Sequence, residues 1–403
     1  MKPKVCITTL EFPPDVGGVG ESVYRIAQML IHLGYDVHVA VFRAIFRNER
    51  EKALAGEYQR AGYITTERDG IIVHRLHPAI RSNIGKEQDY LSDLYDQLCV
   101  LQQRHCYDLF HAFFINEMGF LTTLLAKESR VPVINSVRGA DLHKHIFSPQ
   151  QHGQITWTLE NSSWTTFVSR DLMQRGKALV PQIEQHSSAF WNSIAPIEFD
   201  RLPVPTLVDR LQGLVIGSVG SFRDKKGVEY LLDACQTLRD IDFTLLFVGD
   251  FVGKEDEYWR QELQNSGVTD RILITGKISR AEAIAYLPYM DIFTIPSIHD
   301  GCPNALLEAM LAARAIIGTC VDAIGEILEN GVNGLVITPF SSKELADAVR
   351  LLSSQPDLRQ QLGIAARNKV LTQLAPVVEQ QNWQQIYQQV LGKTTQLQCF
   401  NGR

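Results

Sequence analysis

Residues 4–42 read KVCITTLEFPPDVGGVGESVYRIAQMLIHLGYDVHVAVF, and this stretch indicates the class of fold. An apolar run over residues 4–10 predicts a buried strand, and a Pro/Gly loop follows it. In the next segment the apolar residues recur at helical spacing, and Gly34 stands where helices commonly end. A second apolar run, residues 36–42, predicts another strand. Strand, helix and strand in this order form a βαβ unit, which implies a parallel sheet with a right-handed crossover.

The same alternation continues through the first half of the chain and restarts in the second half. In the first half we predict further strands over residues 71–76, 108–113, 132–137 and 165–169. In the second half we predict strands over residues 214–219, 243–250, 272–277, 291–297, 315–319 and 334–337. Their almost continuous apolar character is typical of a sheet covered on both faces. Two successive α/β domains are therefore expected.

The domain boundaries rest on chain length and on one irregular segment. A chain of 403 residues is too long for one ordinary core. Residues 200–213, DRLPVPTLVDRLQG, contain two prolines and show no clear period, which is typical of a linker. We therefore place a Rossmann-like domain over residues 1–205 and a second one over residues 206–375. We expect the C-terminal helix, residues 376–403, to pack back on the first domain.

Composition argues against several classes of protein. Hydrophobic residues make up 45% and charged residues 21% of the chain, as in ordinary globular proteins. The net charge of -6 gives no basic field for nucleic acid. The seven cysteines are scattered and form no C-x-x-C pair, which argues against a disulfide framework or structural zinc and favours a reducing compartment.

The distribution of apolar and basic residues also bears on membrane association. No apolar run approaches the ~18 residues of a membrane span, so we expect a cytoplasmic protein. The basic stretch RAIFRNEREK, residues 43–52, leaves peripheral contact with the inner membrane face open. Its interspersed acids favour a solvated segment instead.

The glycine-rich loop after the first predicted strand is the first candidate site. Gly17, Gly18 and Gly20 let the backbone turn tightly and approach a ligand, and the free N–H groups of the following helix suit an anion. A dinucleotide site would need glycine where Val23 stands and an acid where the next strand ends in Phe-Arg. An oxidoreductase is therefore disfavoured, and a tight turn without a ligand remains the alternative.

A second candidate loop opens the second half. The segment GSFRDKKG, residues 220–227, places Arg223, Lys225 and Lys226 between a predicted strand and a helix. Cations at the carboxyl end of a strand can neutralise a diphosphate leaving group. A solvated basic turn is the alternative.

The third candidate is DGCPNALLE, residues 300–308. Pro303 suits the first helical position, and the helix that begins near Asn304 offers free N–H groups to phosphate. Glu308 lies one turn further, where a carboxylate can accept hydrogen bonds from the cis hydroxyls of a ribose. With Asp300 before the helix, the two acids fit a ligand that has hydroxyls at both ends and charge between them. A capped core helix with a chance pair of acids is the alternative.

Taken in order, these segments resemble the retaining glycosyltransferases of family 4, whose GT-B fold has two Rossmann-like domains facing an interdomain cleft. The family pattern EGxPxxLLEAM is similar to DGCPNALLEAM, with Asp300 and Glu308 in its two acidic places. The FPP…GG loop of the family is similar to residues 12–18, and its phosphate segment to residues 220–227, with Lys226 as the lysine. In the same order follow VGD at 248–250, TGKI at 275–278 and ENGVNGLVI at 329–337.

The resemblance implies a role for each matching residue. The first acid binds hydroxyls of the donor sugar and the second binds the ribose, while the basic pair binds the diphosphate and the backbone near Ile278 holds the base. Gly17 and Gly18 would lie under the diphosphate from the other domain. The expected donor-site residues are Gly17, Gly18, Arg138, Arg223, Lys226, Ile278, Asp300, Gly301, Asn304, Ala305, Leu306 and Glu308. Those expected closest to the reaction are Asp300, Arg223, Lys226 and Asp141.

The chain departs from the family pattern at several positions. Asp300 replaces glutamate, so its carboxylate reaches one methylene less far. Ser221 stands where a basic residue is usual, which leaves Arg223 to serve instead. The His-Gly-x-Asp stretch of the family reads RGAD over residues 138–141, and because that histidine often contacts the donor sugar, the arginine bears on sugar selectivity. Asp322 and the alanine after it stand where a Gly-Gly pair is common.

We therefore expect a retaining transfer of a hexosyl unit from a nucleoside-diphosphate sugar, UDP-sugar first and GDP-sugar next, to a hydroxyl acceptor. The resemblance favours front-face attack, since no residue must act as a covalent nucleophile. No metal or other cofactor is expected, because the Asp240-x-Asp242 spacing lies at a strand entrance, away from the expected cleft. Two alternatives remain: a sugar-nucleotide epimerase or hydrolase of the same architecture, and a non-catalytic nucleotide-sugar-binding protein.

Overall fold

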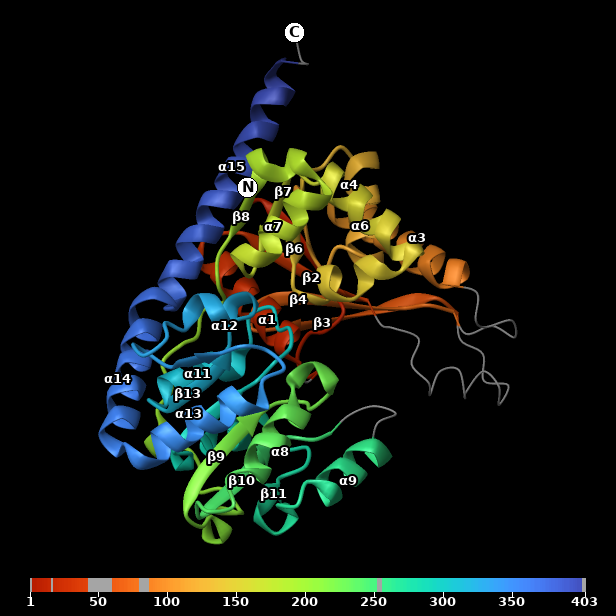
Figure 1. Ribbon diagram of the computed structural model, residues 1–403. Helices are drawn as coiled ribbons and strands as arrows, with labels where there is room; N and C mark the ends of the chain where they lie inside the picture. Colours follow the sequence, from red (N-terminus) through yellow and green to blue (C-terminus); the bar gives the residue numbers. More distant parts are fainter. Residues whose placement is uncertain (1, 16, 43–59, 80–86, 252–255, 401–403) are drawn as a thin grey trace. The chain divides into compact units, whose positions relative to one another are not determined.

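A computed structural model describes residues 2–15, 17–42, 60–79, 87–251 and 256–400 (Figure 1). The chain divides into two units, Met1–Phe190 with Glu379–Arg403, and Trp191–Val378. The basic stretch over residues 43–52 lies outside the described residues. No helix within the described ranges is long and apolar enough to span a bilayer.

The first unit is built on a sheet with the strand order β3-β4-β2-β1-β5-β6-β7-β8, in which only the β3–β4 pair is antiparallel. Its strands are β1 Lys4–Thr9, β2 Asp36–Phe42, β3 Gly62–Arg68, β4 Ile71–His77, β5 Leu109–Phe113, β6 Val133–Val137, β7 Trp164–Phe167 and β8 Ser187–Ala189. Its main helices are α1 Gly18–His32, α3 Glu87–His105, α4 Glu117–Glu128, α5 Ala140–His143, α6 Pro149–Asn161 and α7 Arg170–Leu179. The predicted βαβ unit and the parallel sheet are confirmed.

Both faces of this sheet are covered. Alternate residues of β1 and β2 pack with α1 on one face, while the residues between them pack with α3 and α4 on the other. The helices α3, α4 and α6 follow one another side by side (Figure 1). The edge strand β3 was not predicted, because GYITTER is largely exposed and has no continuous apolar run. Burial on two faces, in contrast, explains why the central strands could be found from their sequences.

The second unit is built on a fully parallel sheet with the order β11-β10-β9-β12-β13-β14. Its strands are β9 Leu214–Val219, β10 Phe243–Val248, β11 Ile272–Ile274, β12 Ile292–Ile295, β13 Ala315–Thr319 and β14 Leu335–Ile337. Its helices are α8 Val228–Gln236, α9 Asp256–Asn265, α10 Arg280–Ala285, α11 Asn304–Leu311, α12 Asp322–Ile327, α13 Ser342–Ser354 and α14 Pro356–Gln373. Successive residues of β10 enter two apolar clusters in turn, so this sheet also has two covered faces. The second predicted α/β domain is therefore confirmed.

The segment between the two sheets packs differently from the expectation. Residues 191–205, which we assigned to the first domain, lie in the second unit. Trp191 Nε1 donates a hydrogen bond to a carboxylate of α12, 2.9 Å away. The amide of Ile194 donates to the carbonyl of Leu374 at 3.1 Å. The division therefore falls after Phe190, because the segment that follows is bound by hydrogen bonds to α12 and to the end of α14.

The last helix, α15 (Pro376–Phe400), belongs to the first unit from Glu379 onward. Its Trp383 and Tyr387 are buried in the apolar cluster that β1, β2 and α1 share. Arg25 of α1 pairs with Glu379, with Nε and Oε2 2.9 Å apart. The helix thus covers the same face of the first sheet as α1.

His111 of β5 links this helix to the sheet. Its Nδ1 lies 2.8 Å from the hydroxyl of Tyr387, and its Nε2 lies 2.8 Å from Oγ of Ser136. Burial, with a smaller contribution from Arg138, lowers the pKa of His111 to about 3. The ring is therefore neutral in the folded protein at neutral pH.

We expect acid to destabilise the protein through His111. Because its folded pKa is about 3 and its ordinary value is 6.5, the unfolded chain binds more protons between these two pH values. Stability should therefore rise with pH across this window and be lost on acidification. The slope of unfolding free energy against pH reports the number of protons taken up on unfolding. In His111→Asn this number should fall by up to about one. Denaturant titrations at several pH values measure the slope.

The matched control for this measurement is His32→Gln, since His32 is exposed at the end of α1. This control separates the effect of the buried ring at position 111 from the effect of removing a histidine from the surface. An equal slope in His111→Asn and the wild type would show that His111 ionises in the folded state and would contradict the expectation.

Candidate active site

The two candidate loops of the second half leave neighbouring strands. β9 and β12 are parallel neighbours, and the strand order reverses between them, with β10 on one side and β13 on the other. The loop over residues 220–227 follows β9, and the loop over residues 296–303 follows β12. In open parallel sheets, ligands bind at the carboxyl ends of the strands where the order reverses.

A buried ion pair joins these two loops. Lys226 Nζ lies 2.5 Å from Asp300 Oδ2, and the two side chains are only 19% and 12% exposed. The backbone joins the loops as well, since the amide of Ile298 donates to the carbonyl of Lys225 at 2.8 Å. Burial opposes the ionisation of Asp300, but Lys226 and Lys225 hold its pKa below the usual range. The carboxylate of Asp300 is therefore charged.

Three cations gather at the end of β9. Arg223 is exposed, whereas Lys225 and Lys226 are partly buried. Burial lowers the pKa of Lys225; the neighbouring Lys226 and Arg223 add to this effect, and Asp300 opposes it. The cluster provides positive charge at the switch point of the sheet. The sequence places all three cations in this loop, and the family resemblance implies diphosphate contacts for Arg223 and Lys226.

Asp322, the first residue of α12, holds the Asp300 loop from the other side. Its Oδ2 accepts a hydrogen bond from the amide of Asp300 at 2.9 Å, and the amide of Ala323 donates to the carbonyl of Gly301 at 3.1 Å. Asp322 has a φ of 44°, a left-handed conformation that aspartate tolerates better than most residues. Here aspartate takes the conformation that would suit glycine, and its side chain adds a loop contact that the sequence did not reveal.

Glu308 of α11 is buried beside a cation that the sequence analysis missed. Nε and Nη2 of Arg280 lie 3.0 and 2.7 Å from Glu308 Oε1. Arg280 begins α10 two residues after Ile278, and the capping box of Ser279 and Glu282 fixes the start of this helix. The ion pair therefore connects the segment expected to hold the base with the acid expected to hold the ribose. In the sequence, only the position of Arg280 two residues after Ile278 indicated that this arginine could belong to the site.

The amino end of α11 differs in detail from the expectation. The helix begins at Asn304, and Pro303 is its N-cap instead of its first residue, because its ψ of 123° is extended. The amide of Leu306 donates to the carbonyl of Pro303 at 3.2 Å. The N–H group of Leu306, which we expected to meet phosphate, is thus hydrogen-bonded within the turn. Asn304 and Ala305 are partly exposed, whereas Gly301 is buried.

Glycines allow the loops of this site to approach one another. Gly249 follows β10 with a φ of 129°, and a Cβ there would lie 2.0 Å from the carbonyl oxygen of Gly220. Gly227 has a φ of 66°, and a Cβ there would lie 2.1 Å from the carbonyl oxygen of Pro296. Close backbone contact across β10, β9 and β12 therefore requires glycine at both positions.

In the first unit, Asp141 is a buried link between two loops. Its Oδ1 accepts from the amide of Ile115 at 2.8 Å, and its Oδ2 accepts from the amide of Arg138 at 2.9 Å. Burial raises the pKa of Asp141, although these amides oppose the shift. Both oxygens thus fix the loops after β5 and β6, which favours a positioning role over direct participation. The guanidinium of Arg138 lies over the ring of Phe113, 5.4 Å from its centroid.

The glycine loop after β1 begins α1 earlier than predicted. Gly17 is the N-cap and Gly18 the first helical residue, whereas the sequence pattern placed the start near Glu21. A Cβ on Gly17 would lie 1.8 Å from Oε2 of Glu11, so the Glu11 side chain lies against the amino end of this helix. A carboxylate there is favoured by the helix dipole. An anionic ligand at Gly17 and Gly18 would have to displace Glu11.

Two further observations concern metals. Asp240, part of the Asp-x-Asp spacing, pairs with Arg350 through oxygens 2.6 and 2.9 Å from its guanidinium nitrogens. Among the described residues, one group of potential metal ligands meets, formed by His38, His74 and His105. It lies in the first unit and was not identified from the sequence.

Comparison with known families covers most of the chain. The family described as Glycosyltransferase Family 4 matches residues 16–181. The family described as Glycosyl transferases group 1 matches residues 213–355. One match thus falls on each of the two units.

The chain is also similar in sequence to individual proteins of known name. The chain is 28% identical to the alpha-D-kanosaminyltransferase of Streptomyces kanamyceticus, over 48% of this chain and about half (51%) of that protein. It is 23% identical to the N-acetyl-alpha-D-glucosaminyl L-malate synthase of Bacillus anthracis, over 97% of this chain and 98% of that protein. Both relatives are named for the transfer or attachment of a sugar.

Solved structures show the same fold. A sucrose-phosphate synthase from Thermosynechococcus elongatus has a TM-score of 0.77 at 17% identity, covering 98% of this chain and 100% of that chain. Anabaena HepE in complex with UDP-glucose has a TM-score of 0.70 at 17% identity, covering 98% of this chain and 99% of that chain.

The two parallel sheets and the loops at their carboxyl ends define a glycosyltransferase of the GT-B type. The chain is a glycosyltransferase, and its two matched domains are consistent with family 4.

We expect Gly227→Ala to destabilise the second unit more than Gly276→Ala. The two glycines have similar φ angles, 66° and 69°, but only Gly276 has open space where a Cβ would lie. The left-handed conformation alone costs a side chain about 1–2 kcal/mol. The clash with the carbonyl of Pro296 should add about 1–3 kcal/mol to Gly227→Ala. Chemical denaturation of both variants measures the difference, and equal losses would contradict the packing described for this loop.

Proposed function

We propose that the protein transfers a hexosyl unit from a nucleoside-diphosphate sugar to a hydroxyl acceptor, with retention of anomeric configuration and without a metal. UDP-sugars are the first choice of donor and GDP-sugars the next. The observation that carries the proposal is the ion pair of Lys226 and Asp300 at the switch point of the second sheet, with Glu308 in the helix that follows. The complex of Anabaena HepE with UDP-glucose supports the choice of UDP.

The proposed donor contacts follow the order of groups in a sugar nucleotide. Glu308 accepts hydrogen bonds from the ribose hydroxyls, and Arg280 positions its carboxylate. The backbone near Ile278 holds the base. Lys226, with the cations beside it, meets the diphosphate, while the charged Asp300 accepts hydrogen bonds from hydroxyls of the sugar.

The proposed chemistry is a substitution at the anomeric carbon. The bond between this carbon and the diphosphate oxygen breaks, and negative charge develops on the leaving diphosphate. Lys226 and Arg223 stabilise that charge. The acceptor oxygen attacks from the same face, forms the new glycosidic bond and gives its proton to the departing phosphate. Since Lys226 is held by Asp300 in the structure, a bound diphosphate shares this cation with the carboxylate.

Lys226→Ala and Glu308→Gln should each lower kcat/KM of sugar transfer by about 10²–10³-fold, because each removes a charged contact to the donor. Lys343→Ala is the matched control, since this lysine is exposed on α13 and pairs only locally with Asp347. The assay uses labelled donor and a mixture of acceptors, and NMR of the product reports its anomeric configuration. Wild-type rates in both variants, or an inverted product, would overturn the proposal.

The same assay without an acceptor separates the alternatives. A transferase turns over donor slowly when no acceptor is present. Rapid release of nucleotide from donor alone would show a hydrolase, and a changed sugar in the recovered donor would show an epimerase. Binding without turnover against all acceptors would show a non-catalytic protein.

Donor preference can be measured by thermal stability. A UDP-sugar at 100 times its dissociation constant should stabilise the folded protein by about 2.7 kcal/mol. We expect the largest increase in melting temperature with UDP-sugars, a smaller one with GDP-sugars and the smallest with ADP-sugars at equal concentration. The Glu308→Gln variant should show a reduced increase. A larger shift with ADP-sugars than with UDP-sugars would contradict the proposed base preference.

We also propose a cytoplasmic location. The six described cysteines with placed side chains are free thiols: Cys6, Cys99, Cys106, Cys235, Cys302 and Cys320. Free thiols are typical of a reducing compartment.

A further inference from the structure

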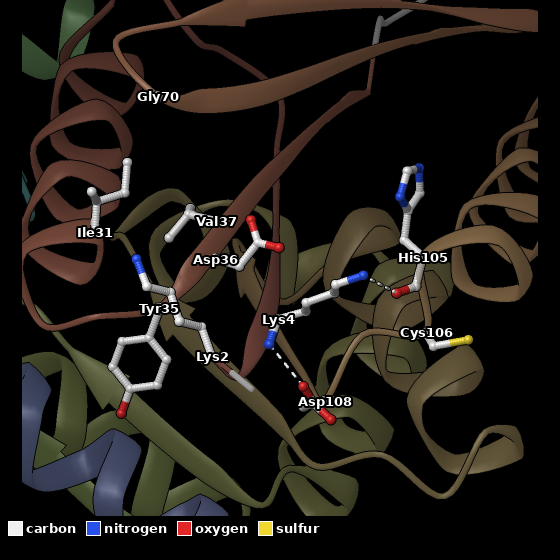
Figure 2. A pocket seen from close by; sticks show the side chains of 10 residues that line it. All are labelled: Lys2, Lys4, Ile31, Tyr35, Asp36, Val37, Gly70, His105, Cys106 and Asp108. Atoms are coloured by element: carbon white, nitrogen blue, oxygen red, sulfur yellow. Dashed lines mark hydrogen bonds between the residues drawn. The ribbon is translucent and has the colours of Figure 1, made fainter.

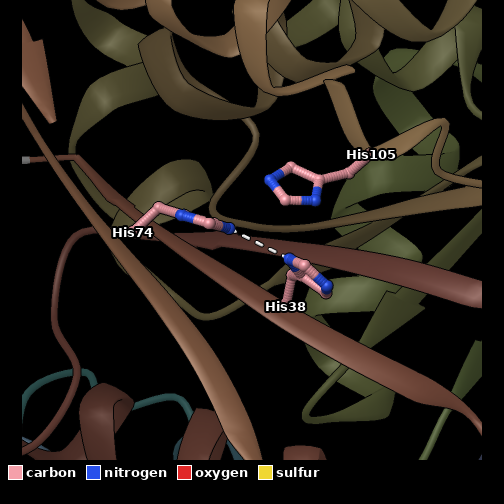
Figure 3. A group of neighbouring side chains, drawn as sticks. All are labelled: His38, His74 and His105. Atoms are coloured by element: carbon pink, nitrogen blue, oxygen red, sulfur yellow. Dashed lines mark hydrogen bonds between the residues drawn. The ribbon is translucent and has the colours of Figure 1, made fainter. Parts of the chain in front are cut away.

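Three histidines from distant parts of the chain meet in the first unit (Figure 3). His38 lies on β2, His74 on β4, and His105 is the last residue of α3. One ring nitrogen of each lies within 4.8 Å of the other two. His38 and His74 are only 2% and 1% exposed, and their facing nitrogens, Nδ1 and Nε2, are 2.9 Å apart.

The register between β2 and β4 brings His38 and His74 together. β2 and β4 are parallel neighbours, with Ala40 opposite His74 and His38 opposite Ile72. Because side chains alternate along a strand, His38 and His74 point to the same face of the sheet. That face is the one covered by α3, whose end brings in His105. The sequence separation of these residues hides the cluster from any local motif.

The outer nitrogens of the two buried rings face oxygens. Thr65 of β3 is the cross-strand partner of His74, and its Oγ1 lies 2.9 Å from Nδ1 of that ring. Asp36 Oδ1 lies 3.9 Å from Nε2 of His38. Histidines that bind metals usually donate their second N–H to an oxygen, and Thr65 is within hydrogen-bond distance of His74 for this purpose, whereas Asp36 is too far from His38. In the structure His38 and His74 share one N–H···N hydrogen bond. A metal ion would replace that shared hydrogen, with the N–H groups then on the outer nitrogens.

The surroundings keep the cluster uncharged. Burial lowers the pKa of His38 and of His74 to about 4, and it also lowers the pKa of His105. Tyr107 places its hydroxyl 3.2 and 3.4 Å from the two inner nitrogens. Burial raises the pKa of Tyr107, so the phenol stays neutral. Neutral imidazole is the form that binds metal ions.

We propose that His38, His74 and His105 bind one divalent transition-metal ion, with Zn²⁺ as the preferred ion. Three imidazoles are a frequent ligand set for zinc, and a fourth position is commonly filled by water. Zinc–nitrogen distances of about 2.0–2.1 Å place two ligand nitrogens of a tetrahedral site about 3.3 Å apart. The observed spacings, from 2.9 Å between the two buried rings to at most 4.8 Å, lie on both sides of this value.

A pocket of about 670 Å³ lies beside the cluster (Figure 2). His105 and Asp36 are among the residues that line it, so it adjoins the cluster from the solvent side. Lys4 also lines it and donates from Nζ to the carbonyl of His105 at 3.2 Å. This ammonium opposes the approach of a cation, and the carboxylates of Asp36 and Asp108 offset it.

The position of the site implies a structural role. The pocket lies where β1 and β2 begin, whereas Asp141 and the glycine loop lie where strands end. Ligands of open parallel sheets bind at the carboxyl ends. An ion held by β2, β4 and α3 would therefore strengthen the first unit without taking part in sugar transfer.

Titration of the full-length, chelator-stripped protein with Co²⁺ tests this site, because four-coordinate Co²⁺ absorbs visibly in a nitrogen site. We expect one equivalent to bind with the spectrum of a four-coordinate ion, Zn²⁺ to displace it, and the melting temperature to rise. His105→Gln, which changes the least buried ligand, should abolish stoichiometric binding. His32→Gln, an exposed histidine of α1, should bind like the wild type.

A second variant keeps the test decisive if His105→Gln fails to fold. Thr65→Val removes no ligand but leaves His74 without its outer partner, and should weaken Co²⁺ binding about 10–100-fold. Circular dichroism shows whether each variant is folded. Absence of stoichiometric Co²⁺ or Zn²⁺ binding to the wild type would overturn the proposal, as would unchanged affinity in folded Thr65→Val. Loss of sugar transfer on metal removal alone would overturn the structural role.

Discussion

Parallel strands can be joined only through crossovers, so the loops that follow them all emerge at the same edge of the sheet. In the second unit this constraint brings together segments that are far apart in the chain. The sheet order reverses between β9 and β12, and such a reversal is where ligands of open parallel sheets bind. Lys226 follows one of these strands and Asp300 the other, and their buried ion pair closes the gap. Gly227 lets the loop after β9 pass close to the carbonyl of Pro296 in the loop after β12.

Two charged pairs of the second unit connect segments that follow different strands. Lys226 and Lys225 hold the pKa of Asp300 below its usual range, although burial opposes its ionisation. Arg280 pairs with Glu308 in the same unit, with Nη2 and Oε1 2.7 Å apart. The carboxylate of Asp322 accepts a hydrogen bond from the backbone amide of Asp300 and so restrains the loop that carries Asp300.

The first unit uses the two edges of its sheet for different purposes. At the carboxyl edge, Asp141 ties two loops together through backbone amides. Near the amino edge, His38, His74 and His105 form a buried polar cluster beside a pocket. The last helix packs on the face shared with α1, where Tyr387 reaches into the sheet by a hydrogen bond.

The sequence by itself determined the central strands and the order of the loops, but not the edge strands β3 and β8. β2 and β9 were predicted to the residue, because a strand buried on both faces leaves a continuous apolar run in its own sequence. The acids at 300 and 308 and the lysine at 226 were likewise found from local motifs. Only the tertiary structure decided that Arg280 pairs with Glu308, that Asp322 takes a left-handed conformation, and that three histidines meet. These features depend on strand register and helix placement, which join residues that no local pattern connects.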